Sequence, residues 1–344
     1  MDEDGNLSIG TRLGEFEIRG LVGAGRTGVV YRAFDHELER EVAIREYLPA
    51  SLASRAEDGH VQVRGRVHAH AFGVGLQQFL RQAQLLARFD HPALVKVFRY
   101  WEGHGTAYMV MPFYAGQTLA QALRQLPAPP TEAWLMGVLV PLLGALDSLH
   151  HQHILHRHVV PDNIRLLRNG RPVLLEPDSA QENLRPGYAP IEQVAEGPDL
   201  RPGPWTDLYA LAAVVHAALT GGPPPAAQTR TVQDGLEPLT AVAARLATTH
   251  GQHYHPAFLA AWQQALAIRP ADRPQNVQAL MQQLGLIPAP MPAGQWSEVP
   301  PDHPRDAAVP RPPATALPAA AVDPLTPLEV PKPRSHGLLA VALA

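Results

Sequence analysis

The sequence predicts an α+β fold with two lobes, in which a small antiparallel β lobe precedes a larger helical lobe. Three observations support this prediction. Short β-branched runs joined by turns dominate residues 11–112, long apolar runs at helical spacing dominate residues 113–286, and proline-rich sequence follows. The chain has 344 residues, of which 46% are hydrophobic, and this is ample for a buried core.

The first lobe is expected to contain five strands and one helix. Its strand segments are rich in β-branched and aromatic residues, which favour extended structure. The helix is expected at 75–89, and its apolar face consists of Leu76, Phe79, Leu80, Ala83 and Leu86. The five predicted strands cover residues 16–23, 28–34, 41–48, 95–101 and 106–111.

The second lobe is expected to be mainly helical. Residues 131–150 repeat leucine and valine at helical spacing, and residues 205–221 are apolar nearly all round, which predicts a buried helix. Between them, two short strands are expected on either side of Asn169 and Gly170, because this dipeptide accepts the positive φ angles of a tight hairpin.

Three segments lie outside the two lobes. Residues 1–10 form an N-terminal extension, and residues 287–336 read as a disordered linker, since their proline and alanine cannot build a core. The apolar tail 337–344 is expected to be a frayed C-terminus. The alternative is that it begins a membrane helix and tethers the protein, since a complete span needs about 20 residues.

Composition excludes several classes of function. A net charge of -4 without a large block of either sign gives no reason to expect a nucleic-acid partner. The absence of cysteine excludes disulfides, thiolate metal ligands and thiol catalysis, and it favours the cytoplasm as the setting.

Three glycines stand in a G-x-G-x-x-G pattern, at Gly23, Gly25 and Gly28. Dinucleotide-binding folds use this pattern too, but there the glycines open a helix. Here the strand-forming residues 29–34 follow, which favours a loop between two strands, and such a loop resembles those that cover bound phosphates. A plain glycine-rich hairpin remains the alternative.

Six further motifs follow in order along the chain. They are VAIR at 42–45, HRHVVPDN at 156–163, EPD at 176–178, PGYAPIEQ at 186–193, WTD at 205–207 and RPADRP at 269–274. Together with the glycines, these motifs resemble those of bacterial serine/threonine protein kinases. The resemblance runs from about Thr11 to Leu286, and it implies the two-lobed protein-kinase fold.

The resemblance implies a role for each matching residue. Asn163 and Glu176 stand at the metal-ligand positions, and the DFG motif of the family is replaced by EPD. The implied structural residues are His156, Arg157, Glu192, Asp207 and Arg273, of which Arg273 would pair with Glu192. The implied nucleotide-binding positions are Gly23, Gly25, Gly28, Val30, Ala43, Met111, Pro112 and Tyr114.

The chain departs from the family at the positions that carry the chemistry. Arg45 replaces the lysine that binds the phosphates, Gln82 replaces its partner glutamate, and His158 replaces the aspartate that accepts the hydroxyl proton. Val160 replaces a further lysine, and Arg165 replaces the apolar residue below the adenine. The loop after EPD is also short, so Arg157 is expected to find a structural partner in place of a loop phosphate.

These departures predict a pseudokinase, which is a signalling or scaffold module with little or no phosphotransfer. Its expected partner is a protein, such as an active kinase or another signalling protein. No cofactor is required, and ATP with magnesium is expected to bind weakly or not at all. The alternative is a slow or unconventional ATP-dependent serine/threonine kinase or transferase that uses Glu176, Asp178 and Asn163 with a metal.

The segment 149–158 contains five histidines, which raises the question of a metal site. His156 and His158 fall on family positions, while His150, His151 and His153 lie at the end of a predicted helix and in its turn. We expect these histidines to have separate roles. A metal site using His150 and His153, which are three residues apart, is the alternative.

Overall fold

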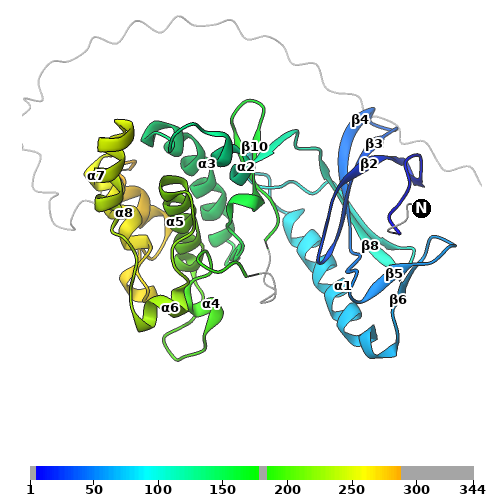
Figure 1. Ribbon diagram of the computed structural model, residues 1–344. Helices are drawn as coiled ribbons and strands as arrows, with labels where there is room; N and C mark the ends of the chain where they lie inside the picture. Colours follow the sequence, from blue (N-terminus) through cyan, green and yellow to red (C-terminus); the bar gives the residue numbers. More distant parts are fainter. Residues whose placement is uncertain (1–4, 178–183, 288–344) are drawn as a thin grey trace, which may run out of the picture. The chain divides into compact units, whose positions relative to one another are not determined.

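The computed structural model describes residues 5–177 and 184–287, shown in Figure 1. All but the first residue of the predicted linker, together with the tail 337–344, lies outside the described residues. The residues Asp178 and Ser179 of the short loop also lie outside them.

The N-terminal lobe is built on a six-stranded antiparallel sheet with the order β1-β2-β3-β4-β8-β7 (Figure 1). The five predicted strands are all present, whereas the edge strand β1 and the separate β5–β6 hairpin were not predicted. The strands of this lobe are β1 (Arg12–Leu13), β2 (Phe16–Gly25), β3 (Gly28–Asp35), β4 (Arg40–Glu46), β5 (Ala53–Arg55), β6 (Val61–Val63), β7 (Arg99–Gly103) and β8 (Thr106–Pro112).

The helix α1 (Arg66–Leu86) packs on this sheet and is longer at its start than the sequence predicted. The predicted face is confirmed, because Phe79, Ala83 and Leu86 are buried. Tyr47, which directly follows β4, packs against α1. Its ring lies 5.2 Å from that of Phe72 and 5.9 Å from that of Phe79, and its hydroxyl donates to the Phe72 carbonyl oxygen at 3.3 Å.

The C-terminal lobe is mainly helical, and it also carries a three-stranded sheet with the order β11-β10-β9. The predicted hairpin is confirmed, since β10 and β11 flank Asn169 and Gly170. The elements of this lobe are β9 (Gly116–Thr118), α2 (Leu119–Gln125), α3 (Glu132–His150), η1 (Pro161–Asn163), β10 (Ile164–Leu167), β11 (Pro172–Leu174), α4 (Ile191–Val194), α5 (Pro204–Thr220), α6 (Ala227–Val232), α7 (Leu239–His250), α8 (Pro256–Ala265), η3 (Pro270–Asp272) and α9 (Val277–Gln283).

Two apolar helices form the centre of this lobe. Every residue of α5 from Thr206 to Leu219 is buried, as its all-round apolar sequence predicted. The helix α3 is long and apolar enough to cross a membrane by composition alone. It buries eight side chains in the helical core, including Leu142 and Leu146, and this packing accounts for its hydrophobicity.

Candidate active site

The residues that the resemblance assigned to catalysis, nucleotide and metal all line one cavity of about 1710 Å³. Strands β2 and β3 supply the glycine loop, β4 and α1 supply Arg45 and Gln82, and the segment around η1 supplies His158 and Asn163. The glycines have different tasks. A Cβ on Gly28 would collide with the carbonyl oxygen of Glu46, whereas one on Gly23 would meet nothing within 4 Å.

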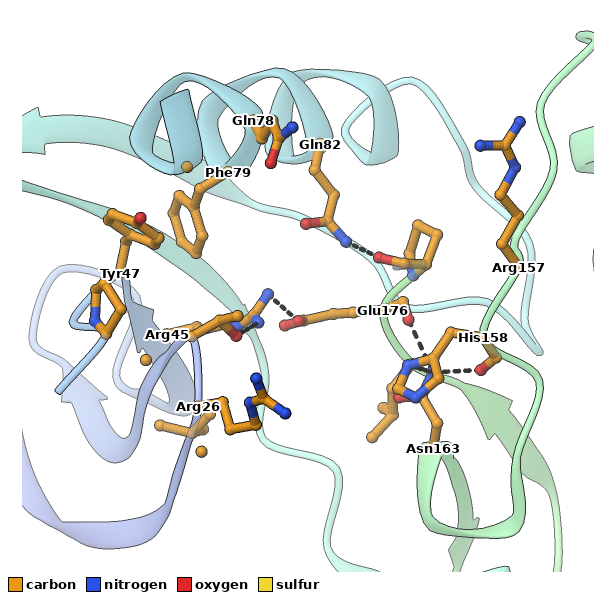
Figure 2. Close-up of a pocket in the computed structure, with 18 of the residues that line it drawn as sticks. Arg26, Arg45, Tyr47, Gln78, Phe79, Gln82, Arg157, His158, Asn163 and Glu176 are labelled. Carbon is orange, nitrogen blue, oxygen red and sulfur yellow. Dashed lines mark hydrogen bonds and ion pairs between the residues drawn. The ribbon is translucent and has the colours of Figure 1, made fainter. Parts of the chain in front are cut away.

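Arg45 forms an ion pair across the cavity with Glu176, as Figure 2 shows. The guanidinium also donates to the Thr27 hydroxyl at 3.0 Å, and it lies over the Phe79 ring at 5.4 Å. The two charged side chains are mostly buried, at 16% and 18% exposed. The cation at the phosphate-lysine position is therefore paired with the carboxylate at the metal position.

Gln82 does not contact Arg45 by any bond in the described structure. Its side-chain amide instead donates to the carbonyl oxygen of Pro177, so α1 is bonded to the backbone that follows Glu176 (Figure 2). A glutamate could not donate this bond, since an ionised carboxylate only accepts. The substitution at Gln82 therefore suits this contact.

His158 and Asn163 lie on the opposite side of the cavity, on the catalytic-loop segment (Figure 2). The Asn163 side-chain nitrogen donates to the carbonyl oxygens of His158 at 2.9 Å and Glu176 at 2.7 Å. It also lies 3.4 Å from His158 Nδ1. Val160, at the position of the second lost lysine, is buried.

A magnesium ion would fit the described residues poorly. Magnesium needs oxygen ligands in near-octahedral geometry, and the carboxylate of Glu176 is already paired with Arg45. Over the described ranges, no group of three or more histidine, aspartate or glutamate side chains is arranged to hold a metal. At the two described positions that the resemblance assigned to metal, the available ligands are the amide oxygen of Asn163 and the paired carboxylate of Glu176.

A second part of the cavity is formed by residues that the resemblance assigned to nucleotide binding. Val30, Ala43, Met111 and Pro112 line it. Arg165 on β10 reaches the same space, and its Nε donates to the carbonyl oxygen of Tyr114 at 3.1 Å. This bond holds a guanidinium group against the segment that follows β8, and burial lowers the pKa of Arg165.

Asp207 at the start of α5 organises the catalytic-loop backbone. Its carboxylate accepts from the backbone N–H groups of His156 at 2.9 Å and Arg157 at 2.7 Å, and it contacts His150 Nε2 at 2.8 Å. Arg157 has a φ of 61°, a conformation that side chains other than glycine rarely adopt. The buried carboxylate thus holds the loop in a strained conformation, and His150 belongs to this network.

His156 is fully buried, and its two ring nitrogens have different partners. Nδ1 accepts from the backbone N–H of His158 at 3.3 Å, and Nε2 lies 3.3 Å from the carbonyl oxygen of Leu175. This arrangement requires a neutral ring with the proton on Nε2. Burial lowers the pKa of His156 to about 4, although the neighbouring Asp207 charge acts to raise it.

Stability should therefore fall in mild acid through His156. Its folded-state pKa lies below the ordinary value of 6.5, so the unfolded chain binds a proton first as the pH falls. The contribution of His156 is fully present above about 6.5 and is lost progressively towards pH 4. Urea unfolding between pH 7.5 and 4.5 should show this decline, and His156→Gln should flatten it. Equal slopes for both chains would contradict the assignment.

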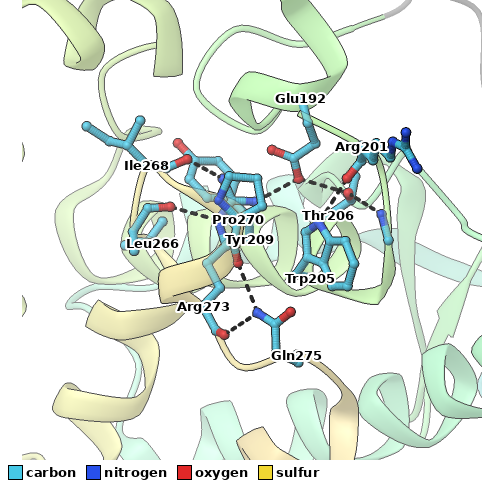
Figure 3. A network of polar contacts seen from close by, with 12 residues as sticks. Glu192, Arg201, Trp205, Thr206, Tyr209, Leu266, Ile268, Pro270, Arg273 and Gln275 are labelled. Atoms are coloured by element: carbon cyan, nitrogen blue, oxygen red, sulfur yellow. Dashed lines mark hydrogen bonds and ion pairs between the residues drawn. The ribbon is translucent and has the colours of Figure 1, made fainter. Parts of the chain in front are cut away.

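A second buried network fixes the base of the helical lobe, as Figure 3 shows. Arg273 Nη1 donates to Glu192 Oε1 at 2.7 Å, and the Thr206 hydroxyl donates to the same oxygen at 2.8 Å. Arg273 also donates to the carbonyl oxygens of Ala267 and Ile268 and lies over the Tyr209 ring at 4.6 Å. The structure thus brings together Glu192 and Arg273, as the resemblance implied.

Two further arginines, Arg157 and Arg26, also line the cavity. The Arg157 side chain has no hydrogen-bond or ion-pair partner among the described residues, so its expected structural partner is not found there. Arg26, which the sequence did not single out, lies at the tip of the β2–β3 turn and points into the cavity beside Arg45 (Figure 2). Its position directly after Gly25, within the glycine motif, could have predicted that it lies near the cavity.

A glycine loop between strands, a hinge, a catalytic loop held by Asp207 and a Glu192–Arg273 pair together define a protein-kinase fold. Residues 16–284 match the protein kinase domain family. The chain belongs to this family.

Relatives support the same assignment. The DNA damage-responsive serine/threonine-protein kinase RqkA of Deinococcus radiodurans is 31% identical over 243 residues, which is 63% of this chain and 32% of that protein. The serine/threonine-protein kinase pkn2 of Myxococcus xanthus is 29% identical over 227 residues, 60% of this chain and 24% of that protein. The chain thus matches only about a quarter to a third of the length of these curated relatives.

Solved structures show the same fold. The structure described as the PpkA-294 apo form has a TM-score of 0.73 and 41% identity, covering 81% of this chain and 99% of that one. The kinase domain of Mycobacterium tuberculosis PknI has a TM-score of 0.58 at 23% identity, covering 81% of this chain and 100% of that one.

Proposed function

We propose that this chain is a pseudokinase, a signalling or scaffold module that keeps the kinase fold but transfers phosphoryl groups poorly or not at all. The observation that carries the proposal is the ion pair between Arg45 and Glu176. Phosphoryl transfer needs a cation on the phosphates and carboxylates on magnesium. Here those two charges neutralise each other.

The neighbouring contacts support the proposal. Gln82 bonds to the backbone of Pro177, so it cannot orient a phosphate-binding cation. His158 replaces the carboxylate that would accept the hydroxyl proton, and loss of a general base costs about 10²–10⁴ in rate. Since Arg45, Gln82 and His158 serve one reaction, their effects are not additive, but they all oppose it.

A phosphotransfer assay tests the proposal. The chain is incubated with labelled ATP, generic protein substrates and either magnesium or manganese. We expect no turnover above that of Arg45→Met. Robust transfer that disappears in Arg45→Met would overturn the proposal.

One observation favours the alternative of a slow, unconventional kinase or transferase. Asn163 donates both of its bonds through nitrogen, which leaves its side-chain oxygen to face a metal beside Glu176. Mass spectrometry after incubation with ATP and metal would then detect a phosphate or nucleotidyl adduct on the chain. A clean spectrum would count against this alternative.

A further inference from the structure

The described lining of the cavity carries more arginines than carboxylates, although the chain as a whole has a negative net charge. The chain carries a net charge of -4, yet the described cavity residues include two carboxylates, Asp162 and Glu176, and six arginines. A cleft of one sign concentrates ligands of the opposite sign. The six arginines that line it are Arg26, Arg45, Arg81, Arg157, Arg165 and Arg185.

Two of these arginines stand where phosphates would lie. Arg26 comes from the turn of the glycine loop and Arg45 from the facing strand β4, and both guanidinium groups point into the same space (Figure 2). The glycine loop leaves this space open, because a Cβ on Gly25 would meet only the Gly28 carbonyl oxygen, at 3.8 Å. A guanidinium group can bind a phosphate through two parallel N–H···O hydrogen bonds, so arginine side chains suit this ligand.

The cavity offers much less to a divalent cation. Gln82 and His158 stand where the family has acidic side chains, so neither offers a carboxylate to a cation. The carboxylate of Glu176 is present, but it is paired with Arg45. A divalent cation entering with phosphates would meet an excess of arginine charge, and it would also cancel part of the phosphate charge that the arginines attract.

We propose that the cleft binds a polyphosphate group as the free anion, without a divalent cation, through Arg26 and Arg45. This inference rests on the proposed function, because it requires that the cleft does not assemble a magnesium–nucleotide complex for transfer. Glu176 then acts as an internal competitor, since an incoming phosphate must replace its carboxylate on Arg45. The base of a nucleotide contributes little, because the Arg165 guanidinium places a polar, charged group in the part of the cavity where a base would need an apolar surface.

Calorimetric titration tests the inference with three probes, namely ATP, GTP and inorganic tripolyphosphate, each in EDTA and in excess magnesium. We expect all three to bind in EDTA with dissociation constants within about threefold of one another, and magnesium to weaken each. Binding that requires magnesium would overturn the inference. Binding of ATP that is much tighter than that of GTP and tripolyphosphate would contradict the prediction that the base contributes little.

The Glu176→Gln variant tests whether Glu176 competes with phosphate for Arg45 or holds a metal ion that bridges the phosphates. If Glu176 competes with phosphate, its neutralisation should tighten tripolyphosphate binding in EDTA by about three- to tenfold, which is the range that a partly buried ion pair supports. If Glu176 holds a metal that bridges the phosphates, the same change should weaken binding. Weaker binding would therefore overturn the inference.

Two further variants locate the anion. Arg26→Gln and Arg45→Met should each weaken tripolyphosphate binding by about tenfold or more, the loss expected for a charge-assisted bond. The matched control is Arg168→Gln, since Arg168 is exposed on the β10–β11 hairpin and does not line the cavity. Unchanged melting temperatures establish that the variants fold.

The outcomes separate this inference from the proposed function. A chain that binds no polyphosphate in EDTA and also transfers none would refute only the inference. A chain that transfers phosphate with magnesium would refute the proposed function whatever it binds in EDTA.

Discussion

Replacing Arg273 with methionine is expected to lower the free energy of unfolding by about 3–5 kcal/mol. Arg273 and Glu192 are both fully buried, so the variant leaves a carboxylate in the core with the Thr206 hydroxyl as its remaining donor. The variant also loses the bonds to the carbonyl oxygens of Ala267 and Ile268. Urea unfolding followed by circular dichroism measures the change.

Two controls accompany this prediction. Arg245→Met breaks an exposed pair with Glu237, whose side chains are 49% and 45% exposed, and should cost about 1 kcal/mol or less. Adding Glu192→Gln to Arg273→Met removes the stranded charge and should recover part of the loss. If Arg273→Met and Arg245→Met lowered the free energy of unfolding equally, the buried pair would not contribute more to stability than the exposed one.

The sequence predicted the architecture because periodicity and motif order are local signals. The strands β2, β3, β4, β7 and β8 followed from their β-branched and aromatic residues, and the buried helix α5 followed from its all-round apolar sequence. The cavity positions followed from the ordered motifs, which the fold brings together from residues far apart in the chain.

The new partners within the site could not be predicted in the same way. The sequence shows that Arg45 and Gln82 break the family's ion pair, but their replacement contacts depend on where two backbones meet in space. Arg45 pairs with Glu176, and Gln82 bonds to Pro177 across 95 positions of sequence. No periodicity carries such information, since it is fixed by packing and by side-chain direction.

The β5–β6 hairpin was missed for a related reason. Its strands are three residues each, which is too short for a clear alternating pattern. The hairpin places Arg55 beside a buried partner. Arg55 pairs with Glu46, the residue next to Arg45, and both side chains are fully buried. Burial alone would lower the pKa of Arg55, yet the Glu46 charge beside it raises it.

Replacing Arg55 with methionine should therefore cost about 3–5 kcal/mol, because it strands the buried Glu46 carboxylate. The Tyr31 hydroxyl donates to that carboxylate at 3.0 Å and would be its remaining partner. Arg55 also donates to the carbonyl oxygens of Gly5 at 3.0 Å and Gly59 at 2.8 Å. Urea unfolding gives the loss, and hydrogen exchange should show it first at residues 5–7 and in the hairpin.

Because Glu46 follows Arg45 and precedes Tyr47, this network also sets the end of β4 against α1. Deleting residues 1–7 removes the hydrogen bonds of Gly5 and Leu7 but leaves the buried pair of Arg55 and Glu46 intact, so it should cost about 1–3 kcal/mol, less than Arg55→Met. Arg32→Met, which breaks an exposed pair with Glu41 in the same sheet, is the matched control at about 1 kcal/mol or less. A deletion as damaging as Arg55→Met would mean that the N-terminal segment, and not the buried ion pair, holds this end of the lobe together.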